Sequence, residues 1–232
     1  MGPIFTGDAL PFQAVIFDFD GLLMDTETTL LQSWQYEWQQ WGLTLSTAGF
    51  FAQHGGNINA QRYDQLAEAV CPGYNRNLSD QRRTKYREQL HQTLSLRPGI
   101  SDWINQALQT SIQLAIASSS PRTWIDEHLA RVGILDCFDV ITTGDEVTRD
   151  KPDPEIYNLA VRRLGVPAAT AVAVEDTGHG VTAAQAAGTF CIAIPNPHVP
   201  NGAVAHADVT LDSATELPLL RALERISTHS EH

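Results

Sequence analysis

Three carboxylates stand at and just beyond the end of one apolar run, in the sequence VIFDFDGLLMD of residues 15–25. Asp18 comes where the run ends, and Asp20 follows two residues later. A carboxylate can attack phosphorus and form an acyl phosphate, while a second carboxyl group can protonate the leaving oxygen and later activate water. If the backbone stays extended, both side chains face the same side, and Gly21 allows a sharp turn directly afterwards. The spacing therefore favours a nucleophile at Asp18 and a general acid and base at Asp20.

Hydroxyl, cationic and acidic side chains follow three further apolar runs, and they are Ser118 with Ser119 and Ser120, Lys151, and Glu175 with Asp176. In open parallel sheets, ligands bind at the carboxyl ends of strands, so these groups can meet the first aspartates there. Clustered carboxylates repel one another and an incoming phosphate, and a hard divalent cation such as Mg²⁺ relieves both problems. Asp18 and Asp176 are the expected side-chain ligands of that ion. Lys151 adds a fixed positive charge for the phosphoryl oxygens, and Ser118 can donate a hydrogen bond to them.

The segments that carry these residues have the pattern of strands in a parallel sheet. Their apolar runs are nearly continuous rather than alternating, as in strands that are buried on both faces. The expected strands are 13–19, 112–118, 138–142, 171–175 and 190–194, with a short edge strand at 208–211. Helical patterns separate most of them, at 99–110, 121–131, 153–164 and 178–188. The alternation predicts an α/β fold, a doubly wound parallel sheet with helices on both faces.

One region breaks this alternation between the first and second strands. From about residue 27 to residue 95 the chain shows helical patterns and no convincing strand, and this stretch is too long for a structureless loop. Segments 59–70 and 79–94 carry the pattern, with a plausible cap at Ser79. We therefore expect an all-helical domain inserted into an α/β core. The expected boundaries are 27–96 for the helical domain and 11–26 with 97–232 for the core.

Two groups of side chains in the helical region have structural interpretations that we favour. They are Trp34, Trp38 and Trp41, which share one helical face, and the cations Arg82, Arg83, Lys85 and Arg87. We expect the tryptophans to form the core of the inserted domain rather than a platform for a substrate. We expect the cations to form a solvated helix face, with the alternative that one of them reaches a substrate anion.

Composition excludes several classes of partner. The 232 residues carry a formal net charge of -12, which repels phosphate backbones, so we expect no nucleic acid to bind. No stretch is long and apolar enough to span a bilayer, and the first residues lack the pattern of a signal peptide. The three cysteines are scattered and fit a reducing compartment. We expect a cytoplasmic protein, a monomer or weak homodimer, with a small-molecule phosphate ester as its partner.

The four polar segments, in their order along the chain, resemble the four motifs of the haloacid dehalogenase (HAD) superfamily. The segments are FDFDGLLMD, ASSS, the lysine of DKPDPEIY, and VEDTGHGVTAAQAAG. The match spans about residues 18 to 188, and the inserted helical region fits the helical (C1) cap that this superfamily places after its first motif. The resemblance implies a Rossmann-like core and hydrolysis through an aspartyl phosphate. Within the superfamily, the chain is most similar to the subgroup of helical-cap phosphatases and β-phosphoglucomutases.

The resemblance also implies a role for each matching residue. Asp18 is the nucleophile, and Asp20 is the general acid and base, with a backbone carbonyl that also contacts Mg²⁺. Glu175 is a direct or water-mediated ligand, and Asp25 caps or orients the loop. The implied metal ligands are Asp18, Asp20, Glu175 and Asp176. The implied phosphate-binding residues are Ser118 and Lys151, with Ser119 as a candidate second donor.

Finer choices within the superfamily depend on departures from its patterns. The dehalogenase branch lacks the second aspartate, so Asp20 sets that branch aside. The mutases carry a Gly-Val-Ser-Arg-like cap segment and a cap histidine, whereas this chain has QHGGNINAQ and Leu30 at these places. The sequence therefore favours a Mg²⁺-dependent phosphatase for a sugar phosphate or similar metabolite, with a β-phosphoglucomutase-type mutase as the alternative. Candidate substrate contacts in the cap loop are His54, Gly55, Gly56 and Asn57.

Two classes outside this superfamily stay open as rivals. The sequence GHGVTA, which starts at Gly178, follows a strand and opens a helix, as the dinucleotide-binding fingerprint of oxidoreductases does. Glu175 and Asp176 stand directly before it and would repel a pyrophosphate. A receiver-like phospho-acceptor domain also uses an acidic cluster, a lysine and Mg²⁺, but the helical insertion and Asp20 argue against it.

Overall fold

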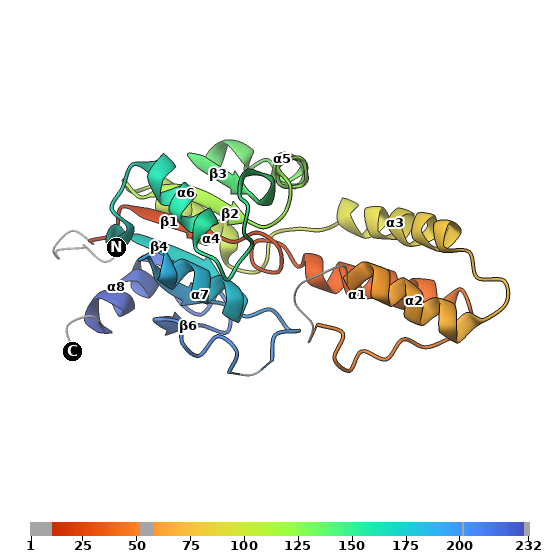
Figure 1. The fold of residues 1–232 in the computed structure, drawn as a ribbon. Helices are drawn as coiled ribbons and strands as arrows, with labels where there is room; N and C mark the ends of the chain where they lie inside the picture. The colour runs from red at the N-terminus through yellow and green to blue at the C-terminus, as the bar shows by residue number, and fades with distance from the viewer. Residues whose placement is uncertain (1–10, 52–57, 201, 230–232) are drawn as a thin grey trace. The chain divides into compact units, whose positions relative to one another are not determined.

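A six-stranded parallel sheet carries the motifs, and its strand order is β3-β2-β1-β4-β5-β6 (Figure 1). The strands are β1 (Ala14–Phe17), β2 (Gln113–Ser118), β3 (Val140–Thr143), β4 (Ala171–Glu175), β5 (Phe190–Ala193) and β6 (Val209–Thr210). Every neighbouring pair is parallel. The order reverses at β1, which is the place where open α/β sheets bind their ligands. The predicted doubly wound α/β fold is therefore confirmed.

The computed structural model describes residues 11–51, 58–200 and 202–229, and the chain forms two compact units. The first unit holds the described residues up to Met24 and from Leu96 onward, and the second holds those from Asp25 to Ser95. The expected division, 11–26 with 97–232 against 27–96, lies close to these limits. That each part is a separate domain stays a prediction.

Helices cover both faces of the sheet in the first unit. They are α4 (Ile100–Leu108), α5 (Arg122–Arg131), α6 (Glu155–Leu164), α7 (Gly178–Ala186) and α8 (Leu219–His229), with short 3-10 helices η1 (Leu135–Cys137), η2 (Gly144–Glu146) and η3 (Ala168–Thr170). Helices α6 and α7 contact each other and the strands from β2 to β5, while α4 contacts α8 and β2. All residues of β1 and β4 are buried, so these two strands need apolar side chains on both faces.

Helix α8 was not among the predicted elements. Its buried residues Leu219, Ala222, Leu223 and Ile226 recur at helical spacing, which is the signal that identifies it. They pack where α8 contacts α4 and β6, so the helix completes one face of the sheet.

The second unit contains the helices α1 (Thr26–Gln39), α2 (Ile58–Val70) and α3 (Arg76–Gln92), and its described residues include no strand. Asp25 caps α1 by accepting a hydrogen bond from the Thr28 amide at 3.0 Å, as expected for a capping role. Helix α3 begins at Arg76 rather than near Ser79, because Asn75 provides the cap and accepts from the Leu78 amide at 3.1 Å.

The expectation of a solvated cationic face on α3 was wrong for Arg83, which is buried, and Arg82 is only partly exposed because it pairs with a buried glutamate. Glu37 is fully buried and accepts hydrogen bonds from Ser79 Oγ at 2.6 Å and Arg82 Nη2 at 2.6 Å. A buried carboxylate requires such partners. Arg83 is also buried, and its guanidinium lies 4.7 Å from the ring of Trp34. Arg82 and Arg83 therefore join α3 to the rest of this unit, and Trp34 lies in its core.

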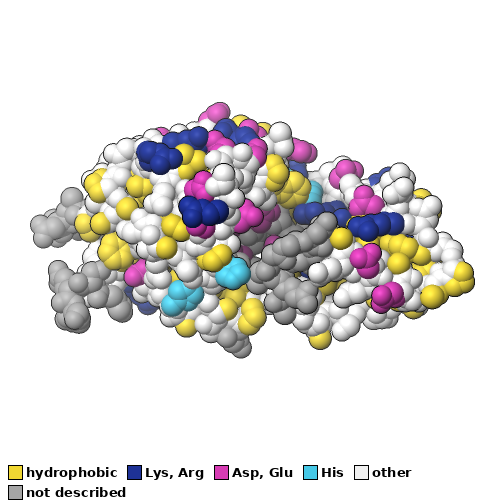
Figure 2. All heavy atoms as spheres, in the orientation of Figure 1, with side chains coloured by type: hydrophobic (Ala, Val, Ile, Leu, Met, Phe, Trp, Pro, Cys, Tyr) yellow, Lys and Arg dark blue, Asp and Glu magenta, His cyan; other side chains and the backbone are white. Residues whose placement is uncertain are grey.

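On the face shown in Figure 2, acidic side chains lie among lysine and arginine side chains. Among the described residues, no helix has the length and apolar character needed to cross a membrane.

Candidate active site

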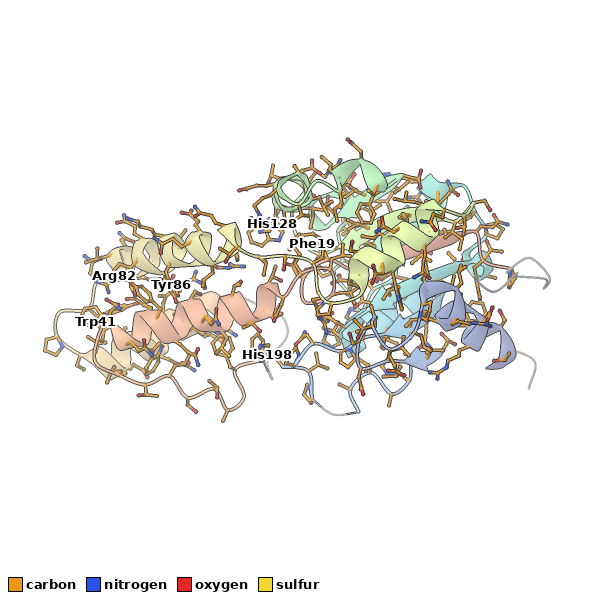
Figure 3. The ribbon with its side chains drawn as sticks, turned by 180° about the vertical axis from the view of Figure 1, so that it is seen from behind. Phe19, Trp41, Arg82, Tyr86, His128 and His198 are labelled. Carbon is orange, nitrogen blue, oxygen red and sulfur yellow. The ribbon has the colours of Figure 1, made fainter. Side chains whose placement is uncertain are left out.

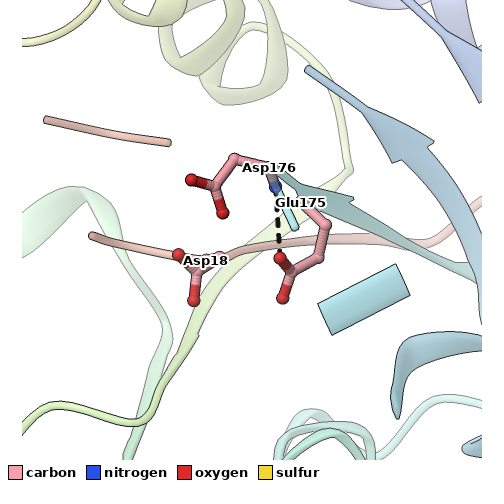
Figure 4. A group of neighbouring side chains, drawn as sticks. All are labelled: Asp18, Glu175 and Asp176. Carbon is pink, nitrogen blue, oxygen red and sulfur yellow. Dashed lines mark hydrogen bonds between the residues drawn. The ribbon is translucent and has the colours of Figure 1, made fainter. Parts of the chain in front are cut away.

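Three buried carboxylates meet at the carboxyl ends of β1 and β4 (Figure 4). Asp18 directly follows β1, Glu175 ends β4, and Asp176 comes next. The amide of Asp18 donates to the Val174 carbonyl at 2.9 Å, which continues the pairing of the two strands. One oxygen from each carboxylate lies within 4.8 Å of the others. Strand register therefore brings together residues that lie about 160 positions apart in the sequence.

Lys151 supplies the positive charge of this cluster. Its Nζ donates to Asp18 Oδ1 at 2.6 Å and to Glu175 Oε1 at 2.6 Å. A third hydrogen bond, at 2.9 Å, goes to the Ala117 carbonyl in β2. Burial opposes the charge of the ammonium, but the two carboxylates outweigh it and raise the pKa of Lys151. The lysine is therefore a fixed cation at the junction of β1, β2 and β4.

The three acidic side chains of the cluster can carry more negative charge than the single ammonium of Lys151 offsets. Burial raises the pKa of the Asp18 carboxyl well above its ordinary value. The ammonium of Lys151 lowers that pKa, and the two neighbouring carboxylates raise it further. Oxygen donors gathered around excess negative charge are the ligands that hard divalent cations prefer. The cluster of Asp18, Glu175 and Asp176 therefore fits a divalent metal ion.

Protein donors orient the acidic pair that follows β4. The phenol of Tyr157 donates to Glu175 Oε1 at 2.5 Å, and burial together with the Glu175 charge raises the pKa of Tyr157 well above its ordinary value. Asn196 Nδ2 donates to Asp176 Oδ2 at 2.6 Å. Gly21 packs so closely on this pair that a Cβ there would lie 2.2 Å from Asp176 Oδ2. The glycine, which has φ of +80°, thus provides both the turn and the space.

The side chain of Asp20, the second aspartate of the first motif, is held by donors from a different segment than those that hold Asp18. Asp20 Oδ2 accepts a hydrogen bond from Ser120 Oγ at 2.5 Å, and Oδ1 accepts one from Trp124 Nε1 at 3.1 Å. Both donors come from the segment where β2 leads into α5. The carboxylate of Asp20 is therefore held toward α5, while that of Asp18 is held toward Lys151.

The two serines predicted to bind phosphate differ in their surroundings. Ser118 is buried at the end of β2, and its Oγ accepts a hydrogen bond from the Ser120 amide at 3.1 Å. Ser119 is exposed, and its carbonyl packs against Gly144, where a Cβ would lie 2.1 Å away. Ser118 therefore lies next to Ala117, whose carbonyl accepts a hydrogen bond from Lys151. The predicted contacts His54, Gly55, Gly56 and Asn57 lie outside the described residues.

Several polar residues at this edge were not predicted from the sequence, and they are Arg97, Trp124, Tyr157 and Asn196. Arg97 joins three loop carbonyls, with hydrogen bonds to Gly21 O at 2.6 Å, Ile194 O at 3.2 Å and Pro195 O at 3.1 Å. Asn196 is one of these residues, and its side chain orients Asp176. Its place in the loop that follows β5 was the available signal, since that loop lies at the same edge of the sheet.

The glycines after β4 have an explanation other than dinucleotide binding. A Cβ at Gly180 would lie 1.9 Å from the carboxyl carbon of Glu175. In the dinucleotide fingerprint, the second glycine lets the backbone approach a pyrophosphate. Here the Glu175 carboxylate occupies that space, so the oxidoreductase interpretation loses its main support.

Comparison with known proteins agrees with this geometry. Residues 15–194 match the family described as haloacid dehalogenase-like hydrolase. This chain belongs to that family. It is 32% identical over 219 residues to YhcW of Bacillus subtilis (strain 168), covering 94% of this chain and 99% of YhcW. Identity is also 32%, over 181 residues, to the phosphorylated carbohydrates phosphatase of Thermotoga maritima, with 76% and 82% of the two chains covered.

Among solved structures, a mutant form of CbbY from Rhodobacter sphaeroides in complex with xylulose-(1,5)bisphosphate superposes with a TM-score of 0.71. The two sequences are 29% identical, and the match covers 91% of this chain and 99% of CbbY. This similarity extends over both units of the chain. The predicted membership of the HAD superfamily is therefore confirmed.

Proposed function

We propose that the protein is a Mg²⁺-dependent phosphatase that hydrolyses a small phosphorylated metabolite, a sugar phosphate or a similar ester, through an aspartyl phosphate on Asp18. One observation carries the proposal: the Lys151 ammonium lies 2.6 Å from Asp18 Oδ1 inside a buried cluster of carboxylates. Membership of the hydrolase family and the similarity to a phosphatase of phosphorylated carbohydrates support it.

The residues that would hold the metal ion follow from the cluster and the resemblance. Asp18 and Asp176 provide carboxylate oxygens, Glu175 binds directly or through water, and Asp20 contributes its backbone carbonyl. When bound, the ion neutralises phosphoryl oxygens and offsets the repulsion between the carboxylates and the ester.

The protein groups then divide the reaction into two displacements. In the first, an Asp18 carboxylate oxygen bonds to phosphorus, the ester P–O bond breaks, and Asp20 protonates the leaving oxygen. In the second, Asp20 takes a proton from water, the water oxygen bonds to phosphorus, and the bond to Asp18 breaks. Lys151 and Ser118 donate to the phosphoryl oxygens in both steps, with Ser119 as a candidate second donor. Phosphate leaves, and both carboxyl groups return to their starting states.

A phosphosugar mutase would use the same core groups, because the aspartyl phosphate can pass to a sugar hydroxyl instead of water. The experiment therefore incubates the wild-type protein and Mg²⁺ with a panel of phosphorylated metabolites and follows both phosphate release and isomer formation. Release of phosphate from sugar phosphates, abolished in Asp18→Asn and retained in Asp126→Asn, is the expected result. Asp126 is a matched control because its carboxylate pairs with Arg122 on the surface of α5. Isomer formation without phosphate release would contradict the phosphatase.

A further inference from the structure

Two uncharged donors hold the carboxylate of Asp20. The indole Nε1 of Trp124 donates to Oδ1 at 3.1 Å, and Ser120 Oγ donates to Oδ2 at 2.5 Å. Each carboxylate oxygen of Asp20 therefore has its own donor. Ser120 lies just before α5, and Trp124 lies in the first turn of that helix. Two such bonds fix both the position and the rotation of the carboxyl plane. No counter-ion is needed to achieve this orientation.

The indole is itself held in place by packing. The ring of His128, one turn later in α5, lies 4.0 Å from the Trp124 ring between centroids, and His128 Nδ1 bonds to the Trp124 carbonyl at 2.9 Å. Phe19 packs edge-on against His128 with centroids 6.0 Å apart, and both are labelled in Figure 3. Because Phe19 lies between Asp18 and Asp20 in the chain, the same ring stack touches the first motif and the helix that carries the donor.

The two donors differ in what they permit. An indole N–H can only donate, whereas a hydroxyl can donate or accept. Trp124 therefore holds Oδ1 as an acceptor, while Ser120 remains a suitable partner for Oδ2 whether or not that oxygen carries a proton. The pair can orient Asp20 as a carboxylic acid in the first displacement and as a carboxylate in the second.

We propose that Trp124 is a positioning residue for Asp20, and that its indole N–H, together with the Ser120 hydroxyl, holds the carboxyl group in the orientation used for proton transfer to the leaving oxygen. This inference rests on the proposed phosphatase function. Trp124 acts through Asp20, whose carboxyl group it positions. Its substitution should therefore weaken proton transfer more than it weakens ester binding.

The test compares Trp124→Phe with the wild-type protein on 4-nitrophenyl phosphate and on phenyl phosphate, with Mg²⁺ present. 4-Nitrophenolate leaves with little help from an acid, whereas phenolate depends on protonation. Since positioned general acids contribute about 10²–10⁴-fold, we expect kcat/KM, which reports the first displacement and not the hydrolysis step common to both esters, to fall about 10-fold more for phenyl phosphate than for the nitrophenyl ester. Ser120→Ala, which removes the other donor, should show the same selective loss and provides the test if Trp124→Phe does not fold.

Trp103→Phe is the matched control. It also removes an indole hydrogen bond in the first unit, from Nε1 to the Leu217 carbonyl at 2.8 Å, but that bond joins α4 to the segment before α8. The control should lose stability without changing the ratio of the two rates. An equal loss on both esters in Trp124→Phe and Ser120→Ala, or a faster rate in either variant, would overturn the inference.

The design also separates this inference from the proposed function. Asp20→Asn should show the same preference for the nitrophenyl ester in a stronger form. If it does, and the variants of Trp124 and Ser120 do not, only the positioning role fails. If the wild-type protein with Mg²⁺ releases phosphate from neither ester, the proposed function fails and the positioning role fails with it.

Discussion

The ammonium of Lys151 lies 2.6 Å from the carboxylate of Asp18, although 133 residues separate them in the chain. The same Nζ lies 2.6 Å from Glu175. A buried lysine shared by two carboxylates is costly unless each charge is paired. The arrangement is therefore expected to depend on all of its members, and the predictions below test them in turn.

Loss of Lys151 should destabilise the protein as well as inactivate it. Lys151→Met leaves Asp18 and Glu175 buried without their cation, so we expect the free energy of unfolding to fall by about 3–5 kcal/mol. Urea denaturation followed by circular dichroism measures this. Lys85→Met on the exposed surface of α3 is the control and should change stability little. A Lys151→Met protein as stable as the control would show that the buried ion pairs are not formed in solution.

Mg²⁺ should stabilise the folded protein, because only the native state gathers the three carboxylates. At a concentration about 100 times Kd, binding adds about 2.7 kcal/mol, which appears as a rise in Tm. Asp176→Asn should lose this rise, whereas Asp126→Asn should keep it. Chelation with EDTA should lower Tm to the metal-free value and stop phosphate release. An unchanged Tm of the wild-type protein at millimolar Mg²⁺ would contradict the metal site.

Stability should fall in mild acid because of His128. Burial lowers the pKa of His128, with the nearby charge of Arg131 in the same direction and the bond to the Trp124 carbonyl opposing it. Below about pH 6.5 the unfolded chain takes up a proton that the folded protein does not, so unfolding becomes easier as pH falls. Denaturation at several pH values should show a smaller slope between pH 5 and 6.5 for His128→Gln than for wild type. His179→Gln, at an exposed position, should keep the wild-type slope. Equal slopes in all three proteins would show that His128 does not cause the pH dependence.

The second unit should depend on its buried glutamate. Glu37→Ala leaves Arg82 and Ser79 without their acceptor, and we expect a loss of about 3 kcal/mol, at the low end for a buried pair because Arg82 is partly exposed. Hydrogen exchange of residues 58–92 measures the effect, with Glu68→Ala on the exposed face of α2 as the control. Unchanged protection in Glu37→Ala would show that the Glu37 network does not hold these helices together.

Much of this structure could be predicted from the sequence because the strands at the centre of the sheet are buried on both faces. Continuous apolar runs marked those strands, and the residues directly after them, such as Asp18 and Asp176, were placed at one edge by topology. Helix α8 has an equally regular pattern but carries no motif, and it was missed. The α3 start was misplaced by one turn because Ser79 is also a good cap, while Asn75 is the residue used.

The supporting contacts could not be predicted in this way. Trp124 and Asn196 act through hydrogen bonds to residues about 100 and 20 positions away, and neither belongs to a pattern with a fixed spacing. Arg82 and Arg83 lie in a strongly polar stretch, so the half-buried place of Arg82 and the burial of Arg83 depend on Glu37 and Trp34, which lie in another helix. Such pairings follow from tertiary packing and are visible only once the helices are assembled.

The most direct test of the account is to find the covalent intermediate. The protein is mixed with Mg²⁺ and 4-nitrophenyl phosphate, quenched in acid during turnover, digested, and examined by mass spectrometry for phosphate on the peptide that contains Asp18. The account predicts phosphate on Asp18 in the wild-type protein and none in Asp18→Asn. Phosphate found on another residue of the wild-type protein during turnover would contradict it. Sustained turnover by Asp18→Asn would contradict it as well.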